Sequence, residues 1–181
     1  MNKNPLTSNG PRRIFASIDL TPVNREYLGR LQKHDIYWIK WMKPSNYHIT
    51  LNFLGDLSAA RIQEVKEVLT EVTKQFSPFT LKLSKITTEL DMLWLVPDES
   101  PELENLQAEL KNTLRGARLG KRERRSFSPH ILLAKSKTGR PMKPVIENFV
   151  PFELQVEKIS LYESELTPGA ATHRLIQSFE L

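Results

Sequence analysis

The sequence predicts one domain that mixes helices and strands, of the α/β or the α+β class. Three segments place apolar side chains at helical spacing, and strand-like runs lie between and after them. This alternation argues against an all-α or an all-β domain. Hydrophobic residues make up 39% of the 181 residues, so the chain can bury an apolar core without metal or disulfide support.

Each predicted helix begins at a residue that suits a helix N-terminus. Thr21 and Ser100 are each followed by proline, which is favoured at the first helical position, and Ser58 is the expected cap of the middle helix. The apolar stripes that follow these caps are Val23, Tyr27, Leu28 and Leu31; Ile62, Val65, Leu69, Val72 and Phe76; and Leu103, Leu106, Leu110 and Leu114.

The strand-like runs show a rough two-fold order. In each half of the chain, a strand and a helix precede a strand that carries a histidine, His48 in the first half and His130 in the second. We expect a flexible leader over residues 1–11 and a single domain over residues 12–181. The predicted strands are Ile14–Leu20, Ile49–Leu54, Phe79–Leu83, Met92–Val96, Phe127–Ala134, Phe152–Val156, Ile159–Glu163 and Leu175–Leu181.

The chain contains no cysteine, which excludes disulfides, thiolate metal sites and a cysteine nucleophile. No apolar run approaches the roughly 18 residues that a membrane span needs, and the N-terminus lacks the apolar centre of a signal peptide. We therefore expect a cytoplasmic protein with no membrane partner, and we expect a monomer.

The net charge of +5 is concentrated in one segment. Residues 111–125 hold seven basic side chains and one acidic side chain, whereas the other 166 residues hold 19 basic and 20 acidic ones. Such a segment suits an anionic partner such as nucleic acid, and equally a solvated helix end whose cations complement the helix dipole. It supplies the candidate RNA-binding residues Arg122, Arg124 and Arg125.

Two strand histidines are the main candidates for chemistry. Alternation along the first strand puts His48 and Thr50 on one face, with Ile49, Leu51 and Phe53 on the buried face. An imidazole beside a hydroxyl suits a phosphate, because the ring can transfer a proton while the hydroxyl binds a non-bridging oxygen.

The second motif is less complete than the first. His130 enters an apolar strand, and the residue that shares its face is Leu132, which has no hydroxyl. If the two halves pack symmetrically, His48 and His130 face one cleft and form an acid–base pair, since the unperturbed pKa of histidine lies near neutrality. We expect no cofactor, and no short ligand spacing supports a metal site made of these two residues and His173.

Longer segments around these histidines are similar to one family. His48–Gly55 reads HITLNFLG, Phe127–Ser136 reads FSPHILLAKS, and the two histidines are 82 residues apart. Together with Arg12–Ile18, Trp41–Pro44 and Leu161–Gly169, these segments resemble the 2H phosphoesterase family, in particular the RNA 2′,3′-cyclic phosphodiesterases, also known as LigT-like 2′–5′ RNA ligases. The resemblance covers about residues 12–181.

The resemblance implies an α+β, bilobal fold in which two pseudo-symmetric sheet-and-helix lobes surround a central cleft. It also implies metal-independent opening of a 2′,3′-cyclic phosphate at an RNA or oligonucleotide end, which leaves a 2′-phosphate. In that reaction His48 would protonate the departing 3′ oxygen, His130 would activate water, and Thr50 would bind the phosphate. Exchanged roles of the two histidines are chemically allowed.

Two positions depart from the family pattern. Leu132 stands where the family usually has Thr or Ser, and Lys135 stands where many relatives have Arg. Loss of an oxyanion-type hydrogen bond reduces turnover by about 10²–10³-fold. The alternative function is therefore an RNA-binding protein of the same fold with weak or altered phosphodiesterase activity. A third hypothesis is 2′–5′ RNA ligation, the reverse of hydrolysis at the same site.

The sequence also predicts positions or roles for the remaining aromatic and histidine residues near the motifs. Trp41 and Tyr47 lie just before the first motif and, with Lys135, are further RNA-binding candidates, since aromatic rings beside a basic cleft can stack on bases. Phe53 is predicted to lie in the core. The prediction for His34 is a surface position. His173 is predicted to be structural or exposed, although it follows a segment that contains glycine and a place near the cleft is left open.

Overall fold

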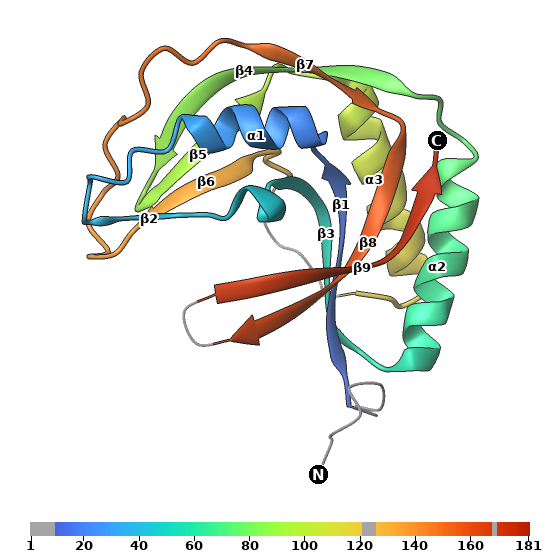
Figure 1. Cartoon of the computed structure of the whole chain (residues 1–181). Coiled ribbons are helices and arrows are strands. Elements are labelled where there is room, and N and C mark those ends of the chain that lie inside the picture. Colours follow the sequence, from blue (N-terminus) through green and yellow to red (C-terminus); the bar gives the residue numbers. More distant parts are fainter. Residues whose placement is uncertain (1–9, 121–125, 168–169) are drawn as a thin grey trace.

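The computed structural model describes residues 10–120, 126–167 and 170–181. Over these residues the chain forms nine strands, three α-helices and one short 3-10 helix (Figure 1). In chain order the elements are β1 (Arg12–Asp19), α1 (Pro22–Arg30), β2 (Ile39–Trp41), η1 (Pro44–Asn46), β3 (His48–Leu57), α2 (Ala59–Thr73), β4 (Phe79–Glu89), β5 (Met92–Pro97), α3 (Pro101–Gly116), β6 (Ile131–Ser136), β7 (Phe152–Val156), β8 (Lys158–Thr167) and β9 (Ala170–Glu180).

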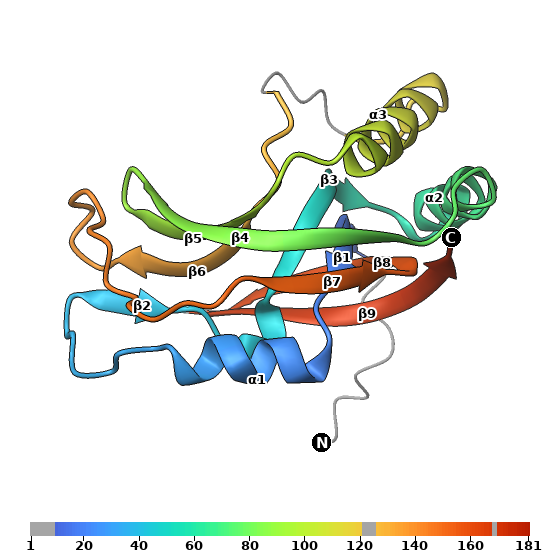
Figure 2. The ribbon, with the colours of Figure 1, turned by 90° about the horizontal axis from the view of Figure 1, so that it is seen from above.

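The strands form two antiparallel sheets, which confirms the α+β class. The first sheet has the order β3-β1-β8-β9 and the second has the order β2-β6-β5-β4-β7. Helices α2 and α3 lie side by side against the first sheet, whereas α1 lies beside the second, near β7 (Figure 2). Strand β3 contacts β6, so the sheets meet where the two histidine motifs lie.

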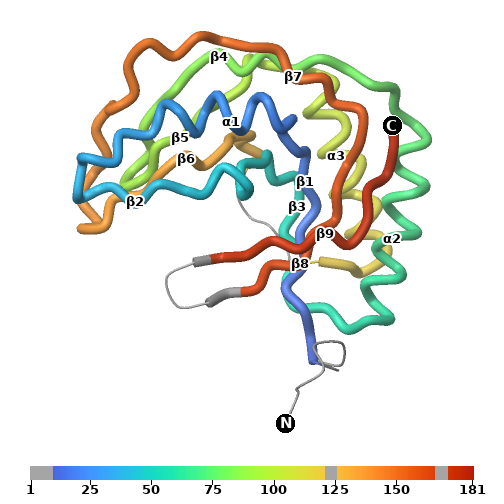
Figure 3. The backbone as a smooth tube through the Cα atoms, viewed as in Figure 1, coloured from blue at the N-terminus to red at the C-terminus, as the bar shows by residue number. Residues whose placement is uncertain are grey.

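The hairpin of β8 and β9 extends beyond the body of the first sheet toward η1 and β2 (Figure 3). One hydrogen bond fastens it there, because the side-chain amide of Asn46 in η1 donates to the backbone carbonyl of Ala171 in β9 over 2.9 Å. The hairpin therefore forms one wall of the region where the sheets meet.

The helices begin as the sequence predicts. Thr21, Ser58 and Ser100 each accept a hydrogen bond from the backbone N–H three residues later, which satisfies a donor that the first helical turn leaves unpaired. One stripe prediction is wrong, because Val23 is exposed in the first turn of α1. The buried residues of α2 and α3 include the predicted Ile62, Val65, Leu69, Val72, Leu103, Leu106, Leu110 and Leu114.

Strand β1 lies at the centre of the first sheet and is buried on both faces. Ile14, Ala16 and Ile18 join the main apolar core, while Phe15 and Ser17 on the opposite face are also buried. The run from Ile14 to Ile18 is apolar except for Ser17, and such a nearly continuous apolar run is typical of a strand covered from both sides.

Several strand predictions need correction. Strand β4 continues past Leu83 to Glu89, β8 continues past Glu163 to Thr167, and β9 already begins at Ala170. The predicted strand Phe127–Ala134 begins only at Ile131, and the short strand β2 was absent from the prediction. Pro129 has no N–H to donate, so the residues before Ile131 do not join the ladder. Strand β2 has three residues, which is too short for a periodic pattern to be visible in the sequence.

Candidate active site

The first motif reaches the cleft with the help of a β-bulge. Strand β3 pairs with β1 so that Thr50 faces Ser17, but the next pair along β1 joins Ala16 to Asn52, which leaves Leu51 as the extra residue. Phe53 then pairs with Phe15. Because the bulge shifts the alternation by one residue, the side chains of His48, Thr50 and Phe53 lie on the same face.

A second bulge lies at the matching place in β6. Leu132 pairs with Trp94 and Ala134 pairs with Leu93, which leaves Leu133 as the extra residue. Lys135, which comes after Ala134, is thereby turned to the same face as Leu132. Leu133 and Lys135 follow Leu51 and Phe53 by the same 82 residues that separate the histidines. The two motifs are thus alike in backbone shape as well as in spacing.

Both imidazoles are oriented by a carbonyl two residues earlier. Nδ1 of His48 lies 2.7 Å from the carbonyl oxygen of Asn46, and Nδ1 of His130 lies 2.8 Å from that of Ser128. A carbonyl can only accept, so Nδ1 carries the proton in each ring and Nε2 is left to take up or release one. Nε2 of His48 also lies 3.0 Å from Oγ1 of Thr50.

Each of the two imidazoles packs against an aromatic ring. Trp94 stacks on His130 with ring centroids 3.8 Å apart and an angle of 12° between the planes. Phe15 packs against His48 at a centroid distance of 4.9 Å. Sequence pattern alone does not indicate that Trp94 lies next to His130, since Trp94 belongs to another strand and only the pairing of β5 with β6 brings the two rings together.

The two histidines and the other cleft residues line one cavity of about 320 Å³. Its lining includes Lys135 and every residue that the resemblance places at the phosphate, namely His48, Thr50, His130 and Leu132. Its walls come from β1, the segment before β3, β3 itself, the segment around β6, and the β8–β9 hairpin. The lining residues are Arg13, Phe15, Met42, Asn46, His48, Thr50, Phe53, His130, Leu132, Lys135, Ser164, Ala171 and His173.

Burial governs the protonation of the cleft histidines. It lowers the pKa of His48 from 6.5 to about 4, because the charged ring loses hydration; the hydrogen bond to Asn46 opposes this and the neighbouring His173 adds to it. Burial also lowers the pKa of His130, against the hydrogen bond to Ser128. Both rings are therefore mainly neutral in the free protein at neutral pH.

Two predictions about individual residues are wrong. Phe53, predicted in the core, is 57% exposed and lines the cleft, because the bulge at Leu51 turns it outward. Tyr47, predicted to bind RNA, is only 1% exposed, since it faces away from the His48 side of the strand and its hydroxyl accepts a hydrogen bond from Gln32. His173, for which the sequence leaves a place near the cleft open, is half-buried and lines the cleft.

The RNA-binding candidates fall in three places. Arg122, Arg124 and Arg125 lie outside the described residues. Lys135 lies in the cleft, and it also lines a second pocket of about 380 Å³ that contains Trp41. Lys40 and Lys43 are further basic residues of this second pocket, which shares Met42, Asn46, Lys135 and Ala171 with the cleft.

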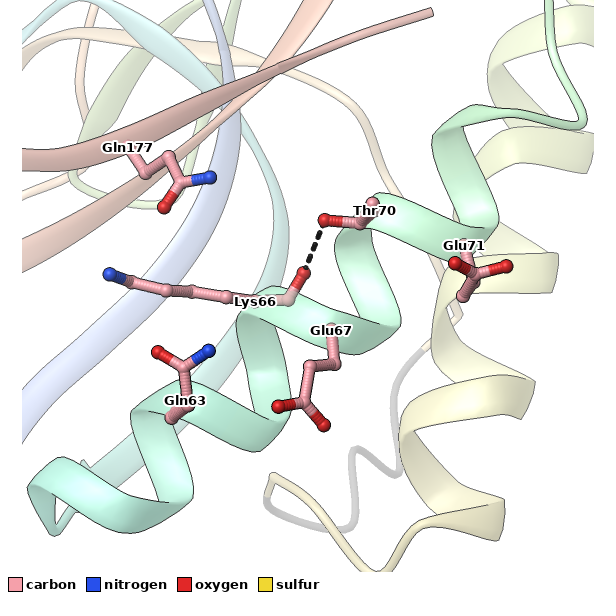
Figure 4. Close-up of a pocket in the computed structure, with 6 residues that line it drawn as sticks. All are labelled: Gln63, Lys66, Glu67, Thr70, Glu71 and Gln177. Atoms are coloured by element: carbon pink, nitrogen blue, oxygen red, sulfur yellow. Dashed lines mark hydrogen bonds between the residues drawn. The ribbon is translucent and has the colours of Figure 1, made fainter.

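A separate surface pocket between α2 and β9 has a different character. It has a volume of about 250 Å³ and is lined by Gln63, Lys66, Glu67, Thr70, Glu71 and Gln177 (Figure 4). Its two carboxylates oppose binding of a phosphate, and no histidine lines it. This pocket therefore does not compete with the cleft as a phosphate site.

Neither a metal cluster nor a membrane helix is found in the described parts of the chain. Across residues 10–120, 126–167 and 170–181, no group of three or more histidine or acidic side chains is arranged to hold a metal ion. Within the same ranges, no helix is long and apolar enough to cross a membrane.

Known proteins share both the sequence pattern and the fold. A Bacillus subtilis protein named RNA 2′,3′-cyclic phosphodiesterase is 32% identical over 137 residues, covering 70% of this chain and 73% of the relative. A protein of the same name from Methanothermobacter thermautotrophicus is 24% identical over 183 residues, covering 93% of this chain and 98% of the relative. The crystal structure of E. coli LigT complexed with NADP+ matches the fold with a TM-score of 0.80 at 23% identity, over 94% of this chain and 98% of the other.

The sequence profile of the 2′-5′ RNA ligase superfamily matches residues 31–168, which include both histidine motifs. This match extends over about three quarters of the chain, from before the first motif to one residue past the end of β8 at Thr167. The chain therefore belongs to the 2′-5′ RNA ligase superfamily.

Proposed function

We propose that this protein hydrolyses 2′,3′-cyclic phosphate ends of RNA or oligonucleotides to 2′-phosphates, using His48 and His130 as a metal-independent acid–base pair. The observation that carries the proposal is that two imidazoles, each oriented through Nδ1 by a carbonyl two residues earlier, line one cavity. The relatives named RNA 2′,3′-cyclic phosphodiesterases support the choice of substrate.

In the proposed reaction, Nε2 of neutral His130 takes a proton from water as the water oxygen attacks phosphorus. The bond between phosphorus and the 3′ oxygen breaks, and Nε2 of protonated His48 gives its proton to that oxygen. The 2′ oxygen keeps the phosphate. Exchange of a proton with solvent then restores both histidines.

The acid role of His48 requires help from the substrate. Its pKa of about 4 keeps the free ring neutral at pH 7, but a bound phosphate anion raises that pKa by favouring the charged ring. Thr50 beside Nε2 is placed to bind the same phosphate. Lys135 contributes positive charge to the cleft.

RNA is the favoured substrate class because the cleft continues into a basic pocket. Lys40, Lys43 and Lys135 line the second pocket, and Trp41 offers a ring on which a base can stack. A nucleotide upstream of the cyclic end can occupy this pocket while the cyclic phosphate lies between the histidines.

The direct test is incubation of an oligonucleotide with a 2′,3′-cyclic phosphate end, with and without EDTA, followed by identification of the phosphorylated end. We expect a 2′-phosphate in both conditions. His48→Ala and His130→Ala should each abolish hydrolysis while the protein stays folded. Full activity in either variant contradicts the two-histidine mechanism. An acceptor RNA with a free 5′ hydroxyl in the same assay would reveal 2′–5′ ligation, in which that hydroxyl replaces water as the nucleophile and the 3′ oxygen is again the leaving group.

The alternative function, RNA binding with weak turnover, is favoured by one observation. Leu132 lies on the cleft wall where the matching residue of the first motif, Thr50, has a hydroxyl. We expect Leu132→Thr to raise kcat, by up to about 10²-fold, if the missing hydrogen bond limits the reaction. Tight, salt-sensitive RNA binding without turnover in both the natural chain and this variant would favour the binding function instead.

A further inference from the structure

His173 is a third imidazole in the cleft. It lies in β9 opposite Ser164 of β8, and both side chains line the cavity that contains His48 and His130. Its ring centroid is 5.1 Å from that of His48, with an angle of 73° between the planes, and 4.9 Å from that of Phe15. His173 therefore lies beside His48, on the hairpin side of the cleft.

Asn46 contacts both His48 and the strand that carries His173. The side-chain amide of Asn46 holds the carbonyl of Ala171, two residues before His173, and the backbone carbonyl of Asn46 orients Nδ1 of His48. Phe15 then packs against both imidazoles. These contacts keep the two rings next to each other.

The ring nitrogens of His173 are available for a ligand. Among the described residues, neither nitrogen has a hydrogen-bond partner, although the ring is half-buried. Each ring nitrogen can donate or accept a hydrogen bond according to its protonation, so both can pair with a ligand in the cavity. Because this ring faces the cavity of the catalytic pair, the ligand would be the substrate itself.

We propose that His173 binds a non-bridging oxygen of the substrate phosphate, the role for which Leu132 lacks a hydroxyl. This inference rests on the proposed cyclic phosphodiesterase function. Thr50 serves one of the two non-bridging oxygens, and the second oxygen has no hydroxyl partner at Leu132. His173 supplies an N–H to it from the β9 side of the cleft.

The charges around the ring predict when His173 carries a proton. Burial lowers the pKa of His173, and charge on His173 lowers the pKa of His48, so the two rings disfavour protonation of each other. A phosphate anion beside both rings has the opposite effect: it stabilises the charged form of each ring and so raises the pKa of His48 and of His173. The other titratable and charged groups that face this pair are Arg13, Asp19, Arg25, His130, Lys135 and Tyr162.

The test uses inorganic phosphate as the probe and NMR titration of the imidazole C–H signals as the measurement. In the natural chain, phosphate should raise the pKa of His173 by about one unit. His173→Phe keeps a ring but no N–H, and it should weaken phosphate binding about tenfold. His173→Gln keeps an N–H donor and should recover part of that loss. His34→Phe, at an exposed position, is the matched control and should bind phosphate normally.

Two results would overturn the proposal: unchanged phosphate affinity in His173→Phe, or tighter binding by Phe than by Gln, which would indicate that only ring packing matters. The measurement needs no turnover, so it is separate from the test of function. If the natural chain binds phosphate through His173 but never opens a cyclic phosphate, the role of His173 in phosphate binding is confirmed and the proposed cyclic phosphodiesterase function is contradicted.

Discussion

The chemistry of the site depends on which nitrogen of each imidazole carries a proton. In His48 and His130 the Nδ1–H group is held by a carbonyl, so Nε2 is the reactive nitrogen in both rings. Their surroundings differ, since Thr50 lies next to Nε2 of His48 while Trp94 covers one face of His130. Two similar rings are therefore placed in different environments, which is how one histidine can serve as acid and the other as base.

A substrate with sulfur at the 3′ bridging position distinguishes the acid role proposed for His48 from the base role proposed for His130. If the 3′ bridging oxygen is replaced by sulfur, the leaving group needs no proton, because a thiolate is a far better leaving group than an alkoxide. His48→Asn should lose about 10²–10⁴-fold in kcat on the oxygen substrate and much less on the sulfur substrate. His130→Asn should lose activity on both. The opposite pattern would show that the roles are exchanged, and equal losses throughout would contradict an acid–base pair.

The low pKa of His48 also predicts how stability depends on pH. The unfolded chain binds this proton with the ordinary pKa of 6.5, whereas the folded chain binds it only near pH 4. As the pH falls from 6.5 to 4, the unfolded state is protonated first, so this group lowers the free energy of unfolding by about 3 kcal/mol. Above pH 6.5 it has no such effect.

Denaturant unfolding at several pH values tests this prediction. His48→Asn should lose less stability than the natural chain between pH 6.5 and pH 4, while His34→Asn, at an exposed position, should behave like the natural chain. An identical pH dependence in His48→Asn and the natural chain would mean that the buried ring titrates normally.

At the scale of elements, two β-bulges shape the site. Strand alternation alone would put residues two apart on the cleft face, and Phe53 and Lys135 would point into the core. The extra residues Leu51 and Leu133 shift each strand by one position, and both of these leucines are buried. Each motif thereby presents a histidine, the residue two positions later and the residue five positions later to the same cleft.

The β8–β9 hairpin is held against η1 by the side chain of Asn46. Asn46→Ala removes the hydrogen bond to Ala171 but keeps the backbone carbonyl that orients His48. We expect a loss of about 1 kcal/mol in stability and faster amide hydrogen exchange over residues 171–174. Ser45→Ala, the exposed neighbour, is the control, and unchanged exchange in Asn46→Ala would show that the hairpin is held by other contacts.

At the scale of the molecule, the sheets meet along β3 and β6, and the cleft between the motifs opens into the basic second pocket. The order of the strands places Lys40, from β2, next to Lys135, from β6. The basic wall of this pocket thus comes from residues far apart in the sequence. In the proposed function, a nucleic acid chain contacts this wall while its cyclic phosphate end lies between the histidines.

Neutralising this wall should affect long substrates selectively. The double change Lys40→Gln and Lys43→Gln should raise KM for a cyclic-phosphate oligonucleotide and lower the salt slope of binding by about 1.4, since two phosphate contacts are removed and each contributes about 0.7 on a single strand. KM for a 2′,3′-cyclic mononucleotide should stay the same. Lys66→Gln, in the pocket between α2 and β9, is the control. Equal losses on both substrates would place these lysines at the cyclic phosphate itself.

Much of the fold could be predicted because its signals are local. Caps such as Thr21, Ser58 and Ser100 act within one helical turn, and the stripes of α2 and α3 repeat over several turns. The weaker predictions concern places where local pattern is absent or misleading. Strand β2 is short, and Pro129 delays the start of β6 until after His130.

The sequence by itself determined that the domain mixes helices and strands, which two histidines carry the motifs, and their likeness to a family, because each of these depends on residue type and spacing along one segment. Only the tertiary structure decided which other side chains meet at the cleft. It turned Phe53 outward, buried Tyr47, stacked Trp94 on His130 and placed His173 beside His48. The physical reason is that bulges, strand pairing and hairpin position depend on contacts between distant segments, which no local periodicity records.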